Sequence, residues 1–220
     1  MARLEAMSDR ATVPRGRHAP PLEQRLSVQR RRLFQAAASV FARMGYADAS
    51  AEAIAREARM SKATFYEHFA NKEECILALF DRATTLVLGA MAEAAQDAGD
   101  DPRERLSAGT RAFLDMLAQY PAAAQTLLVE IMAAGERGAE RRDRVMAAFA
   151  SVIDAENAAG AARSDDIERL ASPDDAFAIV GAVVELASRQ VRLGVPEDIR
   201  DLEPVVERLI VSLVSPAAAA

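Results

Sequence analysis

The residues best suited to bind another molecule lie between Ser61 and Glu74, where hydroxyl, ammonium, phenol and imidazole groups follow one another closely. Ser61 is a good N-cap for a helix that begins at Lys62, because its side-chain oxygen can accept a backbone N–H. Asn71, with Glu74 three residues later, predicts a second helix start through a capping box. The helix between the two starts has room for about two turns.

A helix over residues 62–69 is too short to be stable alone, since isolated helices below about 12–15 residues are marginal in water. Phe65 and Phe69 are four residues apart and share one face, so we expect them to dock the helix on the protein. The opposite face carries Lys62, Ala63, Tyr66 and Glu67. A short docked helix with such an outward face is typical of a recognition helix.

The sequence around this helix contains further patterns in a fixed order. They are Ala36-Ala37 and Phe41 in a first helix, Gly45-Tyr46 at its end, Ser50, Ile54, Ala55 and Ala58 in a second helix, and then Ser61 to Phe69 and Asn71 to Glu74. In this order and spacing, the stretch from Arg30 to Phe80 resembles the DNA-binding domain of the TetR family of bacterial transcriptional regulators. The resemblance implies a three-helix unit with a helix-turn-helix, an all-helical ligand-sensing domain and a homodimer, and it leaves the ligand open.

Two positions depart from the family pattern. The turn before the third helix is usually Ala-Gly, and here it is Ala58-Arg59. If Arg59 adopts the left-handed conformation, its Cβ costs about 1–2 kcal/mol. Glu52 stands near the start of the second helix, where the family often has a basic or neutral residue, so DNA contacts from that helix are less expected.

We predict DNA contacts by residues of the second, third and fourth helices. They are Ser50, Ser61, Lys62, Ala63, Thr64, Tyr66, Glu67, His68 and Lys72. Lys62 and Ala63 lie at the helix N-terminus, from which a guanine edge and a thymine methyl can be reached. Thr64, Tyr66 and His68 offer donors to phosphates, although Tyr66 could equally be an amphipathic core residue.

The basic and acidic groups around the recognition helix allow more than one role. Lys72 begins the fourth helix, where its charge and the helix dipole favour a phosphate, as for the matching lysine of the family. Glu67 could accept from cytosine N4 or point away from the DNA. Arg30-Arg31-Arg32 either contacts the DNA backbone or is a solvated charge run. Arginines of the arm, such as Arg15, could reach a minor groove.

The charge is unevenly distributed along the chain. The 220 residues carry a net charge of −6, but residues 1–80 hold 13 Lys and Arg against 9 Asp and Glu, and the remainder holds 14 against 24. A basic module joined to an acidic one is the pattern expected of a DNA-binding regulator.

Composition predicts an all-α fold of about nine helices, since alanine is abundant, Trp is absent and Gly and Pro are sparse. We expect a flexible Arg-rich arm at 1–22, the DNA-binding domain at 23–71, a helical effector-binding and dimerisation domain at 72–215 and a frayed tail at 216–220. Met7 could be the true start in place of Met1. The apolar runs are too short to span a bilayer and the N-terminus does not resemble a signal peptide, so a cytoplasmic location is expected.

The C-terminal helices are expected to serve assembly and effector binding. The last two, about 173–193 and 202–214, carry more apolar positions than one side of a small domain hides, which predicts a homodimer through them, with an ordinary intrachain core as the alternative. Candidate pocket residues are Phe113, Met116, Tyr120, Leu127, Phe149 and Phe177. They are equally good core residues, and the scarcity of charge among them favours a small apolar effector.

The sequence therefore predicts a homodimeric repressor that binds a palindromic DNA operator and is released by a small-molecule effector. The alternative is a TetR-like DNA-binding protein that is controlled by a protein partner and senses no small molecule. An enzyme is not expected, because no metal-ligand cluster, phosphate-cradling Gly loop or nucleophile motif is present in the sequence. No cofactor or metal is predicted, and Cys75 is expected to be a small buried residue rather than a redox sensor.

Overall fold

The computed structural model describes residues 21–163 and 167–214, with side chains described as far as Ile210. These residues form helices and no strand, which confirms the all-α prediction. Most of the expected arm, including Arg15 and both candidate start residues, lies outside the described residues, as does the expected tail at 216–220.

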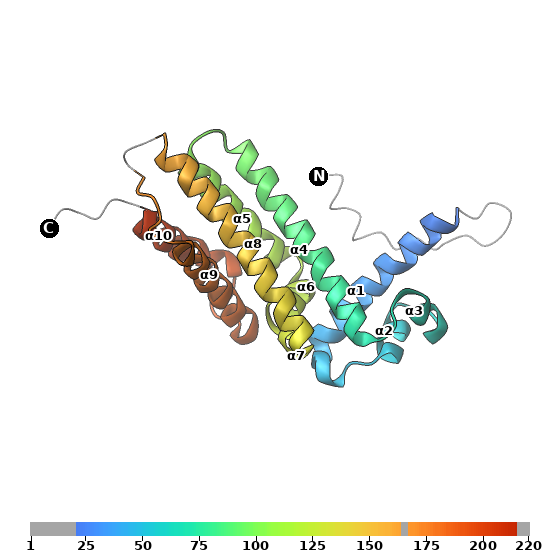
Figure 1. Ribbon diagram of the computed structural model, residues 1–220. Helices are drawn as coiled ribbons and strands as arrows, with labels where there is room; N and C mark the ends of the chain where they lie inside the picture. Colours follow the sequence, from blue (N-terminus) through green and yellow to red (C-terminus); the bar gives the residue numbers. More distant parts are fainter. Residues whose placement is uncertain (1–20, 164–166, 215–220) are drawn as a thin grey trace.

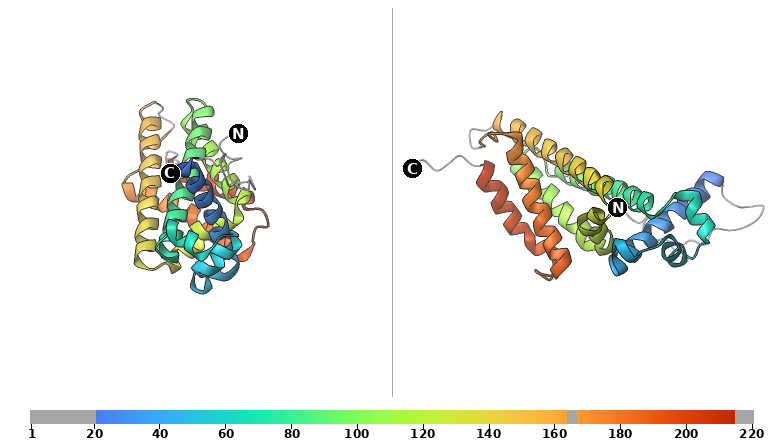
Figure 2. Two further views of the ribbon diagram at one scale, coloured as in Figure 1. Left: turned by 90° about the vertical axis from the view of Figure 1, so that its right-hand side faces the viewer. Right: turned by 60° about the horizontal axis from the view of Figure 1, so that its bottom comes forward.

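The helices form an elongated arrangement (Figures 1 and 2). In chain order they are α1 (Leu22–Asp48), α2 (Ala51–Glu57), α3 (Lys62–His68), α4 (Lys72–Asp97), α5 (Pro102–Gln119), α6 (Pro121–Gln125), the π-helix η2 (Thr126–Glu130), α7 (Ile131–Ala133), α8 (Glu136–Ala161), α9 (Pro173–Leu193), the 3-10 helix η3 (Ile199–Leu202) and α10 (Glu203–Val214). Helices α1–α3 gather at one end, α5 and α8–α10 lie toward the other, and α4 runs between them (Figure 1).

The N-terminal helices enclose one apolar core with the first half of α4. Its fully buried members include Leu33, Phe41, Ile54 and Ile76. Cys75 also lies in this core, where burial raises the pKa of its thiol to about 12, so the thiol stays protonated. This environment fits the expected small buried residue.

The docking of α3 by its two phenylalanines is confirmed. Phe65 is completely buried and Phe69 is nearly so. Their ring centroids are 5.6 Å apart, and Phe69 also packs against Phe34 of α1 at 5.5 Å. Helix α3 is therefore held by α1 through aromatic contacts beyond its own two turns.

The helix starts are capped where the sequence predicts them. Ser50, Ser61 and Asn71 accept backbone N–H groups from Ala53, Thr64 and Glu74 at 2.9–3.1 Å. Of the capping box predicted at Asn71, only the hydrogen bond to the Asn71 side chain forms. The prediction for Glu74 is wrong, because its carboxylate accepts from Arg137 of α8 at 2.7 Å instead of closing the box.

Two residues adopt the left-handed backbone conformation near the helix-turn-helix. Gly45 interrupts α1 with φ of 75°, so the regular helix ends where the sequence predicts. Arg59 has φ of 54° in the turn between α2 and α3, where the family pattern has glycine. The anticipated strain at Arg59 is therefore present.

Helix α4 is the longest apolar segment among the described residues. An 18-residue window within it has a mean hydropathy of 1.6, and by length and composition alone it could cross a membrane. Its buried residues Ile76, Leu77 and Phe80 instead pack in the N-terminal core, and Val87 packs near α5 and α9. Packing within the protein thus accounts for the apolar character of these residues.

The helical segment from Pro121 to Ala133 is divided into three elements. The backbone widens from the α-helical α6 into the π-helix η2 and becomes α-helical again in α7, and the N–H of Ile131 donates to the carbonyl of Thr126, five residues back. The π-helical turn brings Glu130 to the end of α1, where one carboxylate oxygen accepts from the backbone N–H of Tyr46 at 2.7 Å. The other oxygen accepts from Gln125 at 2.9 Å.

The strain at Arg59 leads to a stability prediction. Arg59→Gly should raise the free energy of unfolding by about 0.5–1 kcal/mol, because glycine removes the Cβ penalty but loses more backbone entropy on folding. The matched control is Arg56→Gly in the last turn of α2, which should lower it by about 1 kcal/mol. Urea unfolding measures both changes, and a destabilised Arg59→Gly variant would contradict the account.

Candidate functional site

The outward face of α3 carries most of the predicted DNA contacts. Lys62, Ala63 and Glu67 are exposed, and Tyr66 is 46% exposed, so the phenol does not act as a core residue. The Tyr66 ring meets the edge of Phe65 at 5.5 Å with an interplanar angle of 90°. The docked phenylalanine thus supports the exposed tyrosine from beneath.

The hydroxyl groups at the start of α3 are joined to one another. Ser61 Oγ accepts the backbone N–H of Thr64 at 3.0 Å and lies 2.9 Å from Thr64 Oγ1. Ser50 plays the same capping part at the start of α2. Ser50 Oγ accepts a hydrogen bond while its hydroxyl is still able to donate one, whereas one hydroxyl of the Ser61–Thr64 pair donates to the other and leaves one O–H for a phosphate contact.

Lys62 forms an ion pair that was not anticipated. Its ammonium contacts the carboxylate of Glu52 on α2, and it lies 5.8 Å from the centre of the Tyr66 ring. The hydrogen bond from Lys62 lowers the pKa of Glu52, so this carboxylate stays charged at neutral pH. Glu52 would therefore compete with DNA for the one lysine of α3.

Lys72 is bound by the protein itself. Its Nζ donates to the carbonyl oxygens of Tyr46, Ala47 and Ala49 at 2.8, 2.9 and 3.1 Å, and it lies 4.5 Å from the centre of the Tyr46 ring. These three acceptors occupy all three donors of an ammonium group. The arrangement ties the start of α4 to the segment between α1 and α2, and a phosphate contact by this side chain would have to displace a carbonyl.

His68 faces α1 instead of the outward face of α3. It is half-buried, and its Nε2 lies 3.3 Å from Oε1 of Gln29. Burial, and then the charge of Arg30, lower the pKa of His68. The imidazole is therefore mainly neutral at pH 7 and adds little positive charge to the surface.

A second candidate site is an apolar cavity of about 460 Å³ between α4, α5, α8 and α9. Of the predicted pocket residues, Phe113 and Phe149 line it. Met116 is buried in the neighbouring core, against which Tyr120 and Leu127 pack, and Phe177 is 41% exposed. These four residues do not line the cavity.

The lining residues that the sequence did not single out lie on α4, α5, α8, α9 and α10, and they include Leu88, Met91, Ala92, Ala95, Val180, Val183 and Val184. Small and branched side chains leave space that bulky ones would fill, so a list of large side chains omits them. At one end of the cavity, Arg105 donates to both carboxylate oxygens of Glu156 at 2.9 and 3.1 Å.

The hydrogen bonds of Lys72 lead to a prediction. Lys72→Met should lower the free energy of unfolding by about 1–3 kcal/mol, because three carbonyl groups lose their donor. Lys62→Met, which removes an exposed ion pair, is the control and should change stability much less.

A salt titration of DNA binding shows whether Lys72 also contacts a phosphate in addition to holding the start of α4. A phosphate contact predicts that Lys72→Met reduces the salt slope by about 1 relative to the wild type. An unchanged free energy of unfolding for Lys72→Met would contradict the proposal that the Lys72 hydrogen bonds hold α4 against the segment between α1 and α2.

Comparisons with known proteins agree with this geometry. The sequence profile described as "Bacterial regulatory proteins, tetR family" matches residues 33–79. The HTH-type transcriptional activator FasR of Mycolicibacterium smegmatis is 35% identical over 89 residues, which is 40% of this chain and 40% of that protein.

Solved structures extend the similarity in fold to most of the chain. The regulator FadR of Bacillus halodurans has a TM-score of 0.74 at 19% identity, covering 83% of this chain and 94% of that one. FadR of Bacillus subtilis, in complex with stearoyl-CoA, has a TM-score of 0.73 at 21% identity, covering 82% and 97%. Residues 33–79 thus match the TetR family of bacterial regulatory proteins, and most of the chain shares its fold with solved bacterial regulators.

Proposed function

We propose that this protein is a homodimeric repressor that binds a palindromic operator through residues 50–72 and releases it when an apolar effector binds. The observation that carries the proposal is that one helix, α4, connects the two candidate sites. It begins beside the docked α3 and lines the cavity with Leu88, Met91 and Ala95. An effector that favours one position of α4 would bias the position of α3 as well.

The proposed DNA contacts follow the exposure of the side chains. Lys62 and Ala63 lie in the first turn of α3, the part of a recognition helix that reaches base edges. Tyr66, Thr64, Ser61 and Ser50 are assigned to phosphates through their hydroxyl groups. Glu67 is exposed and assigned to a cytosine amino group or to solvent.

The proposed effector has a long hydrocarbon part. The cavity lies within the usual size range of ligand pockets, about 300–1,000 Å³, and its lining is largely aliphatic. The similar fold of Bacillus subtilis FadR is known in complex with stearoyl-CoA, which supports an acyl thioester as the first ligand to test. The cavity also favours a small-molecule effector over the alternative of control by a protein partner.

The proposed dimer places two copies of α3 on one operator. A palindromic site requires a two-fold pair of recognition helices. Helices α9 and α10 carry Phe177 and Val205, which are 41% and 39% exposed in the single chain, in keeping with an interface through these helices. Their contact with a second copy would shield these apolar side chains from water.

The ion pair at α3 predicts a gain of function. Glu52→Gln should raise operator affinity at low salt by a factor of about 3–10, because Lys62 is freed and a negative charge near the phosphates is removed. Glu57→Gln is the matched control, since Glu57 lies on the same helix but pairs with Arg43. Equal changes for the two variants, measured by fluorescence anisotropy, would show that Lys62 does not meet DNA.

The cavity predicts a specific loss of effector response. Stearoyl-CoA should raise the thermal unfolding midpoint and weaken operator binding of the wild type. Val183→Phe fills the cavity and should weaken effector binding by about tenfold, which is about 1.4 kcal/mol. Val191→Phe, on the same helix outside the cavity lining, should respond as the wild type does. An undiminished response of Val183→Phe would contradict binding in this cavity.

A further inference from the structure

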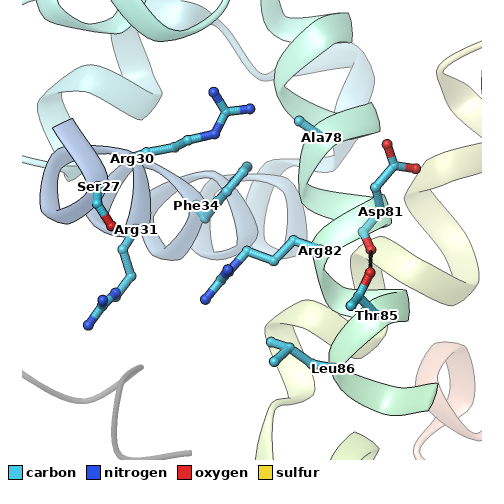
Figure 3. Close-up of a pocket in the computed structure, with 9 residues that line it drawn as sticks. All are labelled: Ser27, Arg30, Arg31, Phe34, Ala78, Asp81, Arg82, Thr85 and Leu86. Carbon is cyan, nitrogen blue, oxygen red and sulfur yellow. Dashed lines mark hydrogen bonds between the residues drawn. The ribbon is translucent and has the colours of Figure 1, made fainter. Parts of the chain in front are cut away.

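A cleft separates the N-terminal half of α1 from the first half of α4. It has a volume of about 600 Å³. Its lining residues are Ser27, Arg30, Arg31, Phe34, Ala78, Asp81, Arg82, Thr85 and Leu86 (Figure 3). They come from α1 and α4 alone, so this α1–α4 cleft is distinct from the outward face of α3 and from the apolar cavity.

The α1–α4 cleft carries three positive charges and one negative charge. Arg30 and Arg31 come from α1, and Arg82 extends from α4 toward α1 (Figure 3). The carboxylate of Asp81 lies on the other side of α4 (Figure 3) and forms an ion pair with Arg141 of α8. The one acidic group of the lining is thus already neutralised outside the cleft.

Several arginines outside the cleft are neutralised by carboxylates, as in the pairs Arg43–Glu57, Arg111–Glu203 and Arg169–Asp154. Within the described residues, Arg31 and Arg82 have no ion pair or hydrogen bond. Their donors remain available to a ligand, and their positive charges lie around one concave surface.

The floor of the cleft is apolar and partly preorganised. Phe34 is buried, and the Arg30 guanidinium lies 5.4 Å from the centre of its ring and 4.9 Å from that of Phe69. This stacking holds the guanidinium plane of Arg30 in place. Leu86 adds an aliphatic side chain beside Arg82 (Figure 3).

A guanidinium group binds phosphate oxygens through two parallel N–H donors, and a planar group can stack on a guanidinium plane. We propose that the α1–α4 cleft binds a small phosphate ester with a planar group, of the nucleoside phosphate class. Arg31 and Arg82 hold the phosphate oxygens from opposite helices, while the Arg30 guanidinium, supported from below by the buried Phe34, forms the surface under the planar group. The ligand would join α1 to α4 and so affect the unit that carries α3.

Adenosine diphosphate, pyrophosphate and adenosine are suitable probes for calorimetric titration of the full chain. We expect saturable 1:1 binding of adenosine diphosphate, weaker binding of pyrophosphate and no binding of adenosine. The double variant Arg31→Gln/Arg82→Gln should bind adenosine diphosphate at least about tenfold more weakly, since two charge-assisted contacts are lost. Arg144→Gln, which removes an exposed and unpaired arginine of α8, should bind as the wild type does.

The DNA backbone is a second source of phosphate oxygens for these arginines. Operator binding measured without adenosine diphosphate distinguishes a small-molecule ligand from DNA. The double variant should keep the wild-type operator affinity and salt slope if the cleft serves a small molecule. The proposal is overturned if the wild type shows no saturable binding of adenosine diphosphate, or if Arg144→Gln weakens it as much as the double variant does. A double variant that loses operator affinity while adenosine diphosphate binding is absent would assign these arginines to DNA phosphates instead.

Discussion

The burial of Phe65 and Phe69 is the interaction on which the proposed DNA-reading surface depends. Helix α3 has seven residues, and a helix of that length does not persist in water without tertiary contacts. Its two phenylalanines place it against α1, and only then do Lys62, Ala63 and Tyr66 point outward together. The recognition surface is therefore a product of packing and not of helix propensity.

The same packing connects α3 to the rest of the protein. Helix α3 ends at His68 with Phe69 as its C-cap, and α4 begins three residues after Phe69, at Lys72. The side chain of Lys72 holds the start of α4 against the segment between α1 and α2. On the other side, Glu130 of the π-helical turn accepts the N–H of Tyr46. The N-terminal helices are thus attached to the C-terminal ones through α4 and through Glu130, and in the proposed mechanism an effector acts through these two connections.

The features that the sequence predicts well are local. Capping residues such as Ser50, Ser61 and Asn71 and breakers such as Gly45 act within a few residues, so the helices around them begin and end where expected. The fold class followed from the same signals and from the family resemblance.

The features that the sequence missed depend on partners far along the chain. The ammonium of Lys72 binds carbonyls more than twenty residues earlier, and Glu74 pairs with Arg137 in place of closing its capping box. The apolar cavity is lined by side chains of α4, α5, α8 and α9, and only the assembled bundle determines the separation of these helices. The π-helical turn at Thr126–Glu130 likewise has no local signal that distinguishes it from an ordinary helix.

We propose that α3 reads DNA sequence through its first turn, and this can be tested by selecting bound DNA from a random pool. The wild type should enrich a palindromic motif, and Lys62→Ala should lose discrimination mainly at one position in each half-site. Enrichment of no motif by the wild type, or an identical motif with Lys62→Ala, would contradict base reading by Lys62 on α3.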